Sequence, residues 1–192
     1  MRPIVKWPVG HNYSTHTITQ RYNPYSNSKP HLEANIGCYC SYCEKPISDE
    51  SMHVEHIRPK SIHANLEFEW DNFLVSCQRC NGTDNKGTKD VNFNQTHMPH
   101  LNNTFLSIIY FADGSISVDP RMLGAESAKA QSLIDLVGLD KISGHPEHKE
   151  GDKRFERRKT IWEIAEKMKL NYSAANTSLT PDFIATCATK MG

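Results

Sequence analysis

Apolar and polar residues follow a regular pattern mainly in the second half of the chain. Two apolar runs, 105–111 and 115–118, flank the dipeptide Asp113-Gly114. An Asp-Gly step suits a tight turn whose central residues have positive φ angles. The pattern therefore predicts a β-hairpin with its turn at Asp113-Gly114.

Helical spacing follows this hairpin. The segments 125–137 and 153–170 each place apolar side chains along one face, and Gly138 is a natural stop for the first of them. Thr180-Pro181 combines a helix-capping residue with a proline at the first helical position, which predicts a third helix from there on. Nearer the N-terminus, residues 31–36 are expected to form one helical turn.

The most specific pattern in the chain is a pair of CxxC motifs that bracket a polar stretch. Four thiolates at this spacing are typical of a closed tetrahedral zinc site. Ordinary buried thiols are the less specific alternative. We therefore predict a structural Zn2+ bound by Cys40, Cys43, Cys77 and Cys80.

Cys38 offers a second way to build the first motif, because Cys38 and Cys43 would make a Cx4C pair. The tighter pair of Cys40 and Cys43 is preferred. Cys38 and Cys187 are then thiols outside the zinc site, which favours a reducing compartment over a disulfide framework.

Polar residues between and directly after the cysteine motifs have the chemistry of a catalytic site. Glu55-His56 sets a hard oxygen ligand beside an imidazole that can act as a general base near neutral pH. Asn72 precedes the second motif and Asn81 directly follows it. Taken singly, His56 could be a surface or zinc-capping histidine, Asn72 a turn residue and Asn81 a helix cap. Their combination favours a site.

In this order of residues, the segment resembles the HNH nucleases, which have the ββα-metal fold, in a form stapled by zinc. His56, Asn72 and Asn81 fall on the three signature positions, with Asn in place of the His often found at the third. Glu55 stands where the family usually has Asp or His. The resemblance implies strands at 54–57 and 73–75, a loop through 59–71 and a helix that begins near Cys80.

The resemblance also implies a mechanism of phosphodiester hydrolysis. His56 is expected to be the base that activates water, and Asn72 to brace the His56 loop. Glu55 and Asn81 are expected to hold one catalytic ion through oxygen atoms, which suits Mg2+ or Mn2+ better than Zn2+.

Charge is balanced, with 22 Lys and Arg against 22 Asp and Glu, whereas nucleic-acid-binding proteins usually have a basic excess. Local clusters partly answer this. Residues 153–159 contain five basic side chains and one acidic one, although an ordinary solvated helix face explains them equally well. Around the expected site, the basic residues predicted to contact nucleic-acid phosphates are Arg58, Lys60, Arg79 and Lys86.

Composition is that of an ordinary globular protein, with 38% hydrophobic residues and a mean hydropathy of −0.60. No apolar core follows Met1, and the longest apolar stretch, 106–112, is too short to span a bilayer. We therefore expect a cytoplasmic protein without membrane contact.

Most of the chain also resembles a narrower group, the HNH subunits of Septu-type and retron-associated anti-phage systems, at residues 2–6, 54–61, 118–120, 134–140 and 155–158. That resemblance implies an ATPase partner and a nucleic-acid substrate, with DNA favoured over RNA. The alternative is a zinc-stapled module that binds nucleic acid or acts as an adaptor without catalysis.

The expected fold class is α+β, organised in three parts. Residues 1–37 would form an N-terminal extended arm, 38–92 the HNH core with its zinc knuckles, and 93–192 a β-hairpin and helical extension.

Overall fold

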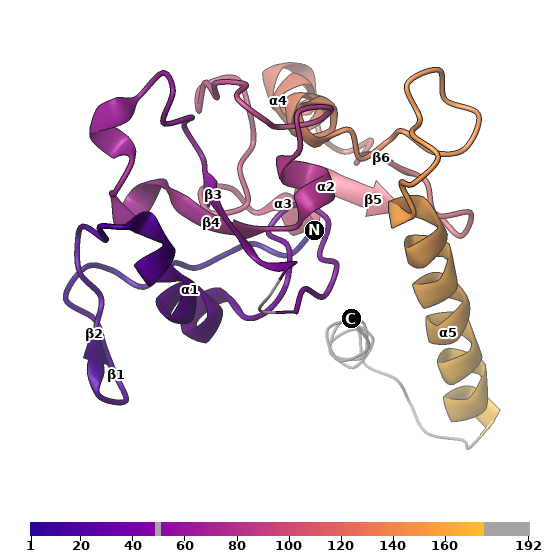
Figure 1. The fold of residues 1–192 in the computed structure, drawn as a ribbon. Helices are drawn as coiled ribbons and strands as arrows, with labels where there is room; N and C mark the ends of the chain where they lie inside the picture. Colours follow the sequence, from indigo (N-terminus) through magenta and orange to yellow (C-terminus); the bar gives the residue numbers. More distant parts are fainter. Residues whose placement is uncertain (49–50, 175–192) are drawn as a thin grey trace. The chain divides into compact units, whose positions relative to one another are not determined.

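The computed structural model describes residues 1–48 and 51–174, drawn in colour in Figure 1. The chain divides into two compact units. The first unit combines Met1–Ile108 with Val118–Gly138, and the second combines Ile109–Ser117 with the chain from Leu139 on. The helix predicted from Thr180-Pro181 and the thiol of Cys187 lie outside the described residues.

At the centre of the first unit, two short strands pair in antiparallel fashion. β3 (His53–His56) aligns Val54 with Val75 and Glu55 with Leu74 of β4 (Phe73–Ser76). Every residue of β4 is buried. The helix α2 (Gln78–Asn81) follows directly. The implied ββα order and the α+β class are confirmed, although α2 begins two residues before Cys80.

Part of the loop between β3 and β4 has regular structure. It contains two 3-10 turns, η3 (Ala64–Leu66) and η4 (Trp70–Asn72). The second turn ends at the residue that precedes β4, so it delivers Asn72 beside the end of β3, where Ile57 N donates to Asn72 O at 2.9 Å.

The first 37 residues contain short elements that pack on this core. They are β1 (Asn12–Tyr13), β2 (His16–Thr17), η1 (Tyr25–Ser28) and α1 (Lys29–Ile36). Lys6 Nζ donates to Trp70 O and to Phe73 O, the latter at 2.8 Å, and burial lowers the pKa of Lys6 to about 7. The arm is therefore anchored by its backbone and side chains rather than extended away from the core.

The predicted hairpin is correct at its turn and wrong at its start. β5 (Ile108–Tyr110) and β6 (Ile116–Val118) form one sheet, and Gly114 has the positive φ of 86° that the turn requires. Residues 104–107, however, form the helical turn α3 (Thr104–Ser107). Tertiary hydrogen bonds favour this turn over a strand, because Thr104 Oγ1 donates to Met1 O and Ser107 Oγ bonds His97 Nδ1 at 2.9 Å.

The helix predicted at 125–137 is confirmed as α4 (Gly124–Val137), which ends at Gly138 in the left-handed region. Its buried face consists of Ala130, Leu133, Ile134 and Val137. His97 Nε2 lies 2.8 Å from Glu126 Oε2 of this helix, so one histidine links α3 to α4.

In the second unit, the long helix α5 (Arg154–Ala174) packs its first turn on the hairpin turn. Arg158 donates to Gly114 O at 2.7 Å and to Leu139 O at 2.9 Å. Arg154 is buried and pairs with Asp152 at 2.6 Å. The basic cluster at 153–159 is therefore not a uniform solvated face, because two of its arginines hold this unit together.

The later turns of α5 present apolar side chains to solvent: Trp162, Ile164, Met168 and Leu170. Among the residues that the structure describes, no helix has the length and apolarity needed to cross a membrane.

Candidate functional site

Four cysteine side chains converge where the first loop of the core meets α2. The Sγ atoms of Cys40, Cys43, Cys77 and Cys80 all lie within 4.8 Å of one another. Cys43 Sγ and Cys77 Sγ are 3.7 Å apart. Zn–S bonds of about 2.3 Å in a tetrahedron place sulfur atoms about 3.8 Å apart. The size of the cluster therefore suits a zinc ion.

The thiol chemistry of the cluster also fits a cation. Hydrogen bonds from the thiols of Cys40, Cys43 and Cys80 lower the pKa of Cys77, so the cluster favours a thiolate at this position. Cys38 is not part of it, and its Sγ donates to Glu33 Oε1 at 3.0 Å. Together these observations show that the four predicted cysteines could hold a zinc ion.

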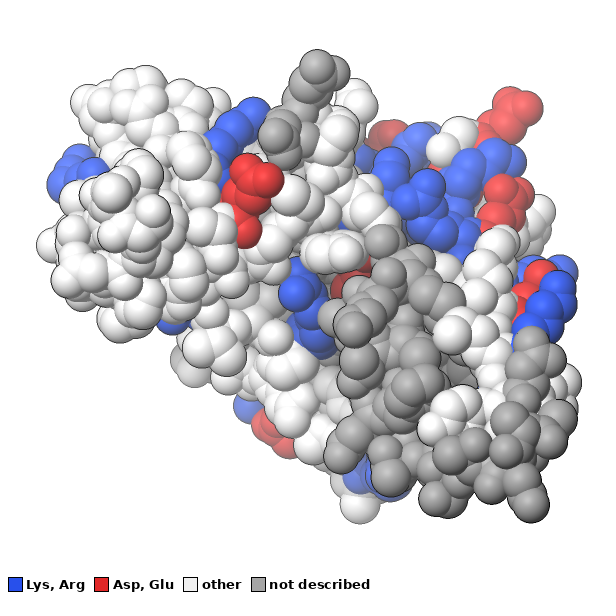
Figure 2. All heavy atoms as spheres, turned by 90° about the horizontal axis from the view of Figure 1, so that it is seen from below, with Lys and Arg blue, Asp and Glu red and all other residues white. Residues whose placement is uncertain are grey.

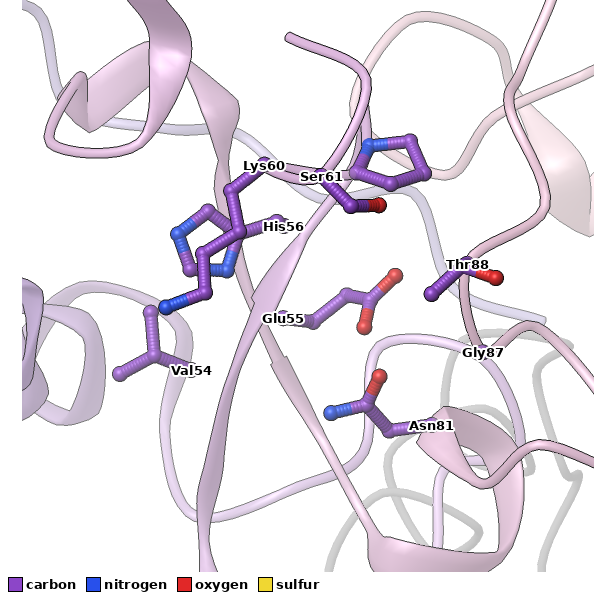
Figure 3. A pocket seen from close by; sticks show the side chains of 9 residues that line it. Val54, Glu55, His56, Lys60, Ser61, Asn81, Gly87 and Thr88 are labelled. Atoms are coloured by element: carbon purple, nitrogen blue, oxygen red, sulfur yellow. The ribbon is translucent and has the colours of Figure 1, made fainter. Parts of the chain in front are cut away.

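A pocket of about 190 Å³ lies beside the cluster, between β3, α2 and two loops (Figure 3). Its lining residues are Val54, Glu55, His56, Pro59, Lys60, Ser61, Asn81, Gly87 and Thr88. In Figure 3 the carboxylate of Glu55 and the amide of Asn81 extend from different elements toward the same space. The pocket thus brings together two oxygen-bearing side chains, which are hard donors suited to Mg2+ or Mn2+.

Glu55 is held in this pocket by buried partners. Only 1% of the residue is exposed, and its Oε1 lies 3.2 Å from Lys86 Nζ and accepts a bond from Tyr42 OH at 3.3 Å. Burial raises the pKa of Glu55 to about 7, and the charge of Lys86 opposes this rise. Sequence reasoning did not identify Tyr42, because its role depends on how the cysteine motif folds over β3.

The predicted phosphate contact at Lys86 does not agree with its position. Lys86 is fully buried, with its ammonium group on Glu55 and on His56 O. A phosphate contact needs an ammonium group that reaches solvent. Lys86 instead supplies the buried countercharge that an ionised Glu55 needs.

His56 lines the same pocket, and in Figure 3 its ring lies on the other side of β3 from the Glu55 carboxylate. His56 Nε2 is 2.9 Å from Glu67 O. Because a carbonyl oxygen only accepts hydrogen bonds, Nε2 carries the proton and Nδ1 carries the lone pair in the neutral ring. Burial lowers the pKa of His56, which favours this neutral form.

Aromatic rings fix the orientation of His56. Its ring centroid is 4.9 Å from that of Tyr25 and 5.3 Å from that of Phe73, both in edge contacts. Tyr25 belongs to η1, far from the cysteine motifs in sequence, so no local signal connected it with the site.

The side chain of Asn72 braces the loop that follows His56. It accepts from Arg58 N at 2.8 Å and donates to Arg58 O at 3.0 Å and to Leu66 O at 3.1 Å. These bonds use both the oxygen and the nitrogen of the side-chain amide. Asn72 touches the loop backbone and does not line the pocket.

Two of the other basic residues near the pocket reach solvent but are paired with carboxylates. Arg58 Nη2 is 3.2 Å from Asp90 Oδ2, and Lys60 Nζ is 3.0 Å from Glu67 Oε1. Arg79 is half-buried on α2. On the face of the molecule in Figure 2, basic and acidic side chains are interspersed and large areas carry neither, in line with the balanced composition.

Comparison with known proteins places this geometry in a family. Residues 40–87 match the family model of HNH endonucleases. This segment is an HNH endonuclease domain. It contains the cysteine cluster and the residues Glu55, His56, Asn72 and Asn81 described above.

Curated relatives of the HNH domain and its flanks come from two bacteria. The Septu protein PtuB of Bacillus thuringiensis is 30% identical over 168 residues, which cover 82% of this chain and 62% of the relative. The "Retron Vc95 putative HNH endonuclease" of Vibrio cholerae serotype O1 biovar El Tor is 36% identical over 112 residues, 55% of this chain and 53% of the relative. The chain thus spans somewhat more than half the length of the curated relatives it matches.

Proposed function

We propose that this protein is a metal-dependent HNH endonuclease that hydrolyses phosphodiester bonds of nucleic acid, with DNA favoured as substrate. The observation that carries the proposal is the pocket in which the Glu55 carboxylate and the Asn81 amide converge, with His56 at the next position of the same strand. This constellation lies within the segment that matches the HNH family model.

Glu55 and Asn81 are the residues that would hold a catalytic Mg2+ or Mn2+. Two protein ligands suffice for such an ion, since Mg2+ usually keeps several waters and binds substrate phosphate directly. When bound, the ion would neutralise charge that develops on the phosphate and on the leaving oxygen.

His56 supplies the base. Its Nδ1 accepts a proton from the attacking water, while Glu67 O holds Nε2–H and so prevents the ring from turning. Asn72 holds the backbone just after His56 in place through its side-chain bonds to Arg58 N and Arg58 O. The base is thereby held in one tautomer and one orientation, as general base catalysis requires.

We further propose that the protein acts in anti-phage defence together with an ATPase subunit in the cytoplasm. Similarity to a protein named for the Septu system and to a retron protein supports the defence role. The exposed apolar side chains of α5, Trp162, Ile164, Met168 and Leu170, suit the docking of another subunit. Arg157 and Lys159 are exposed basic residues of the same helix.

The test is a cleavage assay on plasmid DNA and on RNA, with Mg2+, Mn2+ or chelator, for the chain alone and co-expressed with the proposed ATPase subunit. We expect metal-dependent cleavage that His56→Ala reduces on the order of 100-fold or more, the usual effect of losing a general base. His53→Ala is the matched control, because His53 lies on the same strand but is exposed.

Zinc content and circular dichroism of both variants should equal those of the wild type. If His56→Ala cleaves at the wild-type rate in single turnover, the base lies elsewhere. If the wild type binds nucleic acid but never cuts it, with or without the ATPase, the zinc-stapled binding module is the correct alternative.

The docking proposal has its own test. Met168→Glu should abolish co-purification of the ATPase and leave the cysteine cluster loaded with zinc, because Met168 lies in the second unit and the cluster in the first. Undiminished co-purification would exclude the part of α5 around Met168 as the docking surface.

A further inference from the structure

The cysteine cluster is connected to Glu55 through hydrogen bonds that its sequence spacing does not reveal. Tyr42 lies between Cys40 and Cys43, in the first zinc knuckle, and is fully buried. Its hydroxyl donates to Glu55 Oε1 at 3.3 Å. The backbone of this knuckle is tied to the sheet by Ser41 N, which donates to Val75 O at 2.8 Å. The first knuckle therefore reaches the side chain that would bind the catalytic ion.

The second knuckle provides another donor to the same carboxylate. Lys86 N donates to Cys80 O at 3.1 Å, which keeps this residue in register with the second cysteine motif. Lys86 Nζ lies 3.2 Å from Glu55 Oε1 and donates to His56 O at 3.2 Å. One buried ammonium group thus contacts two successive residues of β3.

Both donors contact the same oxygen atom, Glu55 Oε1. A carboxylate oxygen has two lone pairs, and Tyr42 and Lys86 use both of them on Oε1. The carboxylate can then no longer rotate freely about its last bond. Oε2 becomes the oxygen available to an ion in the pocket, toward which the side chain extends in Figure 3.

The second expected ligand is fixed by the same cluster. Asn81 directly follows Cys80, and its backbone N donates to Cys77 O at 3.0 Å. Its backbone position is therefore set by the second cysteine motif itself.

We propose that Tyr42 and Lys86 are positioning residues that orient Glu55 for the catalytic ion, so that the zinc knuckles determine the geometry of the second metal site as well as the fold. This inference rests on the proposed function, in which Glu55 and Asn81 bind the catalytic ion. A purely structural role of the two residues would change stability or zinc content, whereas a positioning role changes the affinity for the second ion.

The decisive variant is Tyr42→Phe, which removes one donor and keeps the ring and the charge. Mn2+ binding to the purified, zinc-loaded chain is measured by electron paramagnetic resonance, without nucleic acid. We expect the Mn2+ dissociation constant to rise about fivefold, which corresponds to about 1 kcal/mol for one hydrogen bond. Cleavage should recover when Mg2+ is raised, because the defect lies in ion binding.

Matched controls come from the same knuckle. Tyr39→Phe changes a half-buried tyrosine whose ring contacts Arg2 and whose hydroxyl is not a partner of Glu55. Lys45→Met removes an exposed lysine two residues after Cys43. Both controls should keep wild-type zinc content and wild-type Mn2+ affinity.

Lys86→Met tests the second donor, alone and combined with Tyr42→Phe. Because both residues act on one oxygen, the effects of the two substitutions on Mn2+ affinity should be non-additive. Additive effects would mean that they act independently, which would overturn the shared role. If Lys86→Met loses zinc, the Mn2+ affinity of Tyr42→Phe alone decides whether the positioning role is correct.

Two outcomes separate the inference from the function on which it rests. Wild-type Mn2+ affinity in Tyr42→Phe, with zinc retained, overturns the positioning role and leaves the proposed nuclease intact. A wild-type chain that binds no Mn2+ overturns both.

Discussion

Asn72 offers the sharpest test of how the loop after His56 is held in place. Its side chain makes three hydrogen bonds to backbone groups of Arg58 and Leu66, and the residue is 6% exposed. At about 1 kcal/mol for each bond, Asn72→Ala should lower the free energy of unfolding by about 3 kcal/mol.

Asn72→Asp should be no more stable than Asn72→Ala, although aspartate has nearly the same shape as asparagine. The carboxylate can still accept from Arg58 N. It cannot donate to Arg58 O and Leu66 O, and its negative charge would face these two carbonyl oxygens. The order of stability should therefore be Asn first, with Ala equal to or above Asp.

The assay is urea unfolding followed by tryptophan fluorescence. The chain has three tryptophans, and Trp162 belongs to the second unit. A Trp162→Phe background therefore confines the signal to the first unit, where Trp70 is fully buried two residues from Asn72. Asn65→Ala, at an exposed position of the same loop, is the control and should change little. A stable Asn72→Asp variant at neutral pH would refute this account of the loop.

Three further predictions concern zinc, pH and the second unit. Cys77→Ser should lose zinc and with it the fold of the first unit, since metal binding and folding are coupled in such sites; elemental analysis should find about one zinc per wild-type chain, and a folded, zinc-loaded variant would contradict the assignment. Because burial raises the pKa of Glu55 from 4.5 to about 7, the zinc-loaded chain without Mg2+ or Mn2+ should lose stability as the pH rises between these values, and its Mn2+ affinity should increase over the same range. A pH dependence that survives in Glu55→Gln would show that another group is responsible. Gly114→Ala should loosen the start of α5, because Gly114 has a φ of 86° and an added Cβ would lie 2.2 Å from Phe155 O; hydrogen exchange of α5 amides measures this, and unchanged protection would disprove the contact.

Local chemistry explains which features could be predicted from the sequence. The four cysteines converge as expected because each CxxC motif holds two thiols at the spacing that a tetrahedral zinc site requires. The turn at Asp113-Gly114 and the end of α4 at Gly138 follow from backbone angles that glycine adopts readily. Whether Glu55, His56, Asn72 and Asn81 perform their predicted roles stays a prediction for the assays above.

Features that depend on distant contacts escaped prediction. Residues 105–107 have the apolar composition of a strand, yet they lie in a helical turn in which Thr104 Oγ1 donates to Met1 O and Ser107 Oγ bonds His97 Nδ1. Lys86 has a basic side chain of the kind that contacts phosphates, yet it is buried against Glu55. In both cases the deciding partner lies many residues away, where periodicity and spacing give no signal.

The pairing of basic side chains near the pocket has a consequence for how the protein would respond to salt. A phosphate that binds Arg58 or Lys60 must displace Asp90 or Glu67, and the displaced carboxylate then attracts a cation from solution. The counterions released from the nucleic acid are thereby partly taken up again. Instead of the usual slope of about −0.9 per phosphate contact, the logarithm of the binding constant should change only weakly with the logarithm of salt concentration. Arg58 and Lys60 would then add little affinity even at low ionic strength, and binding to nucleic acid would depend on contacts other than these two.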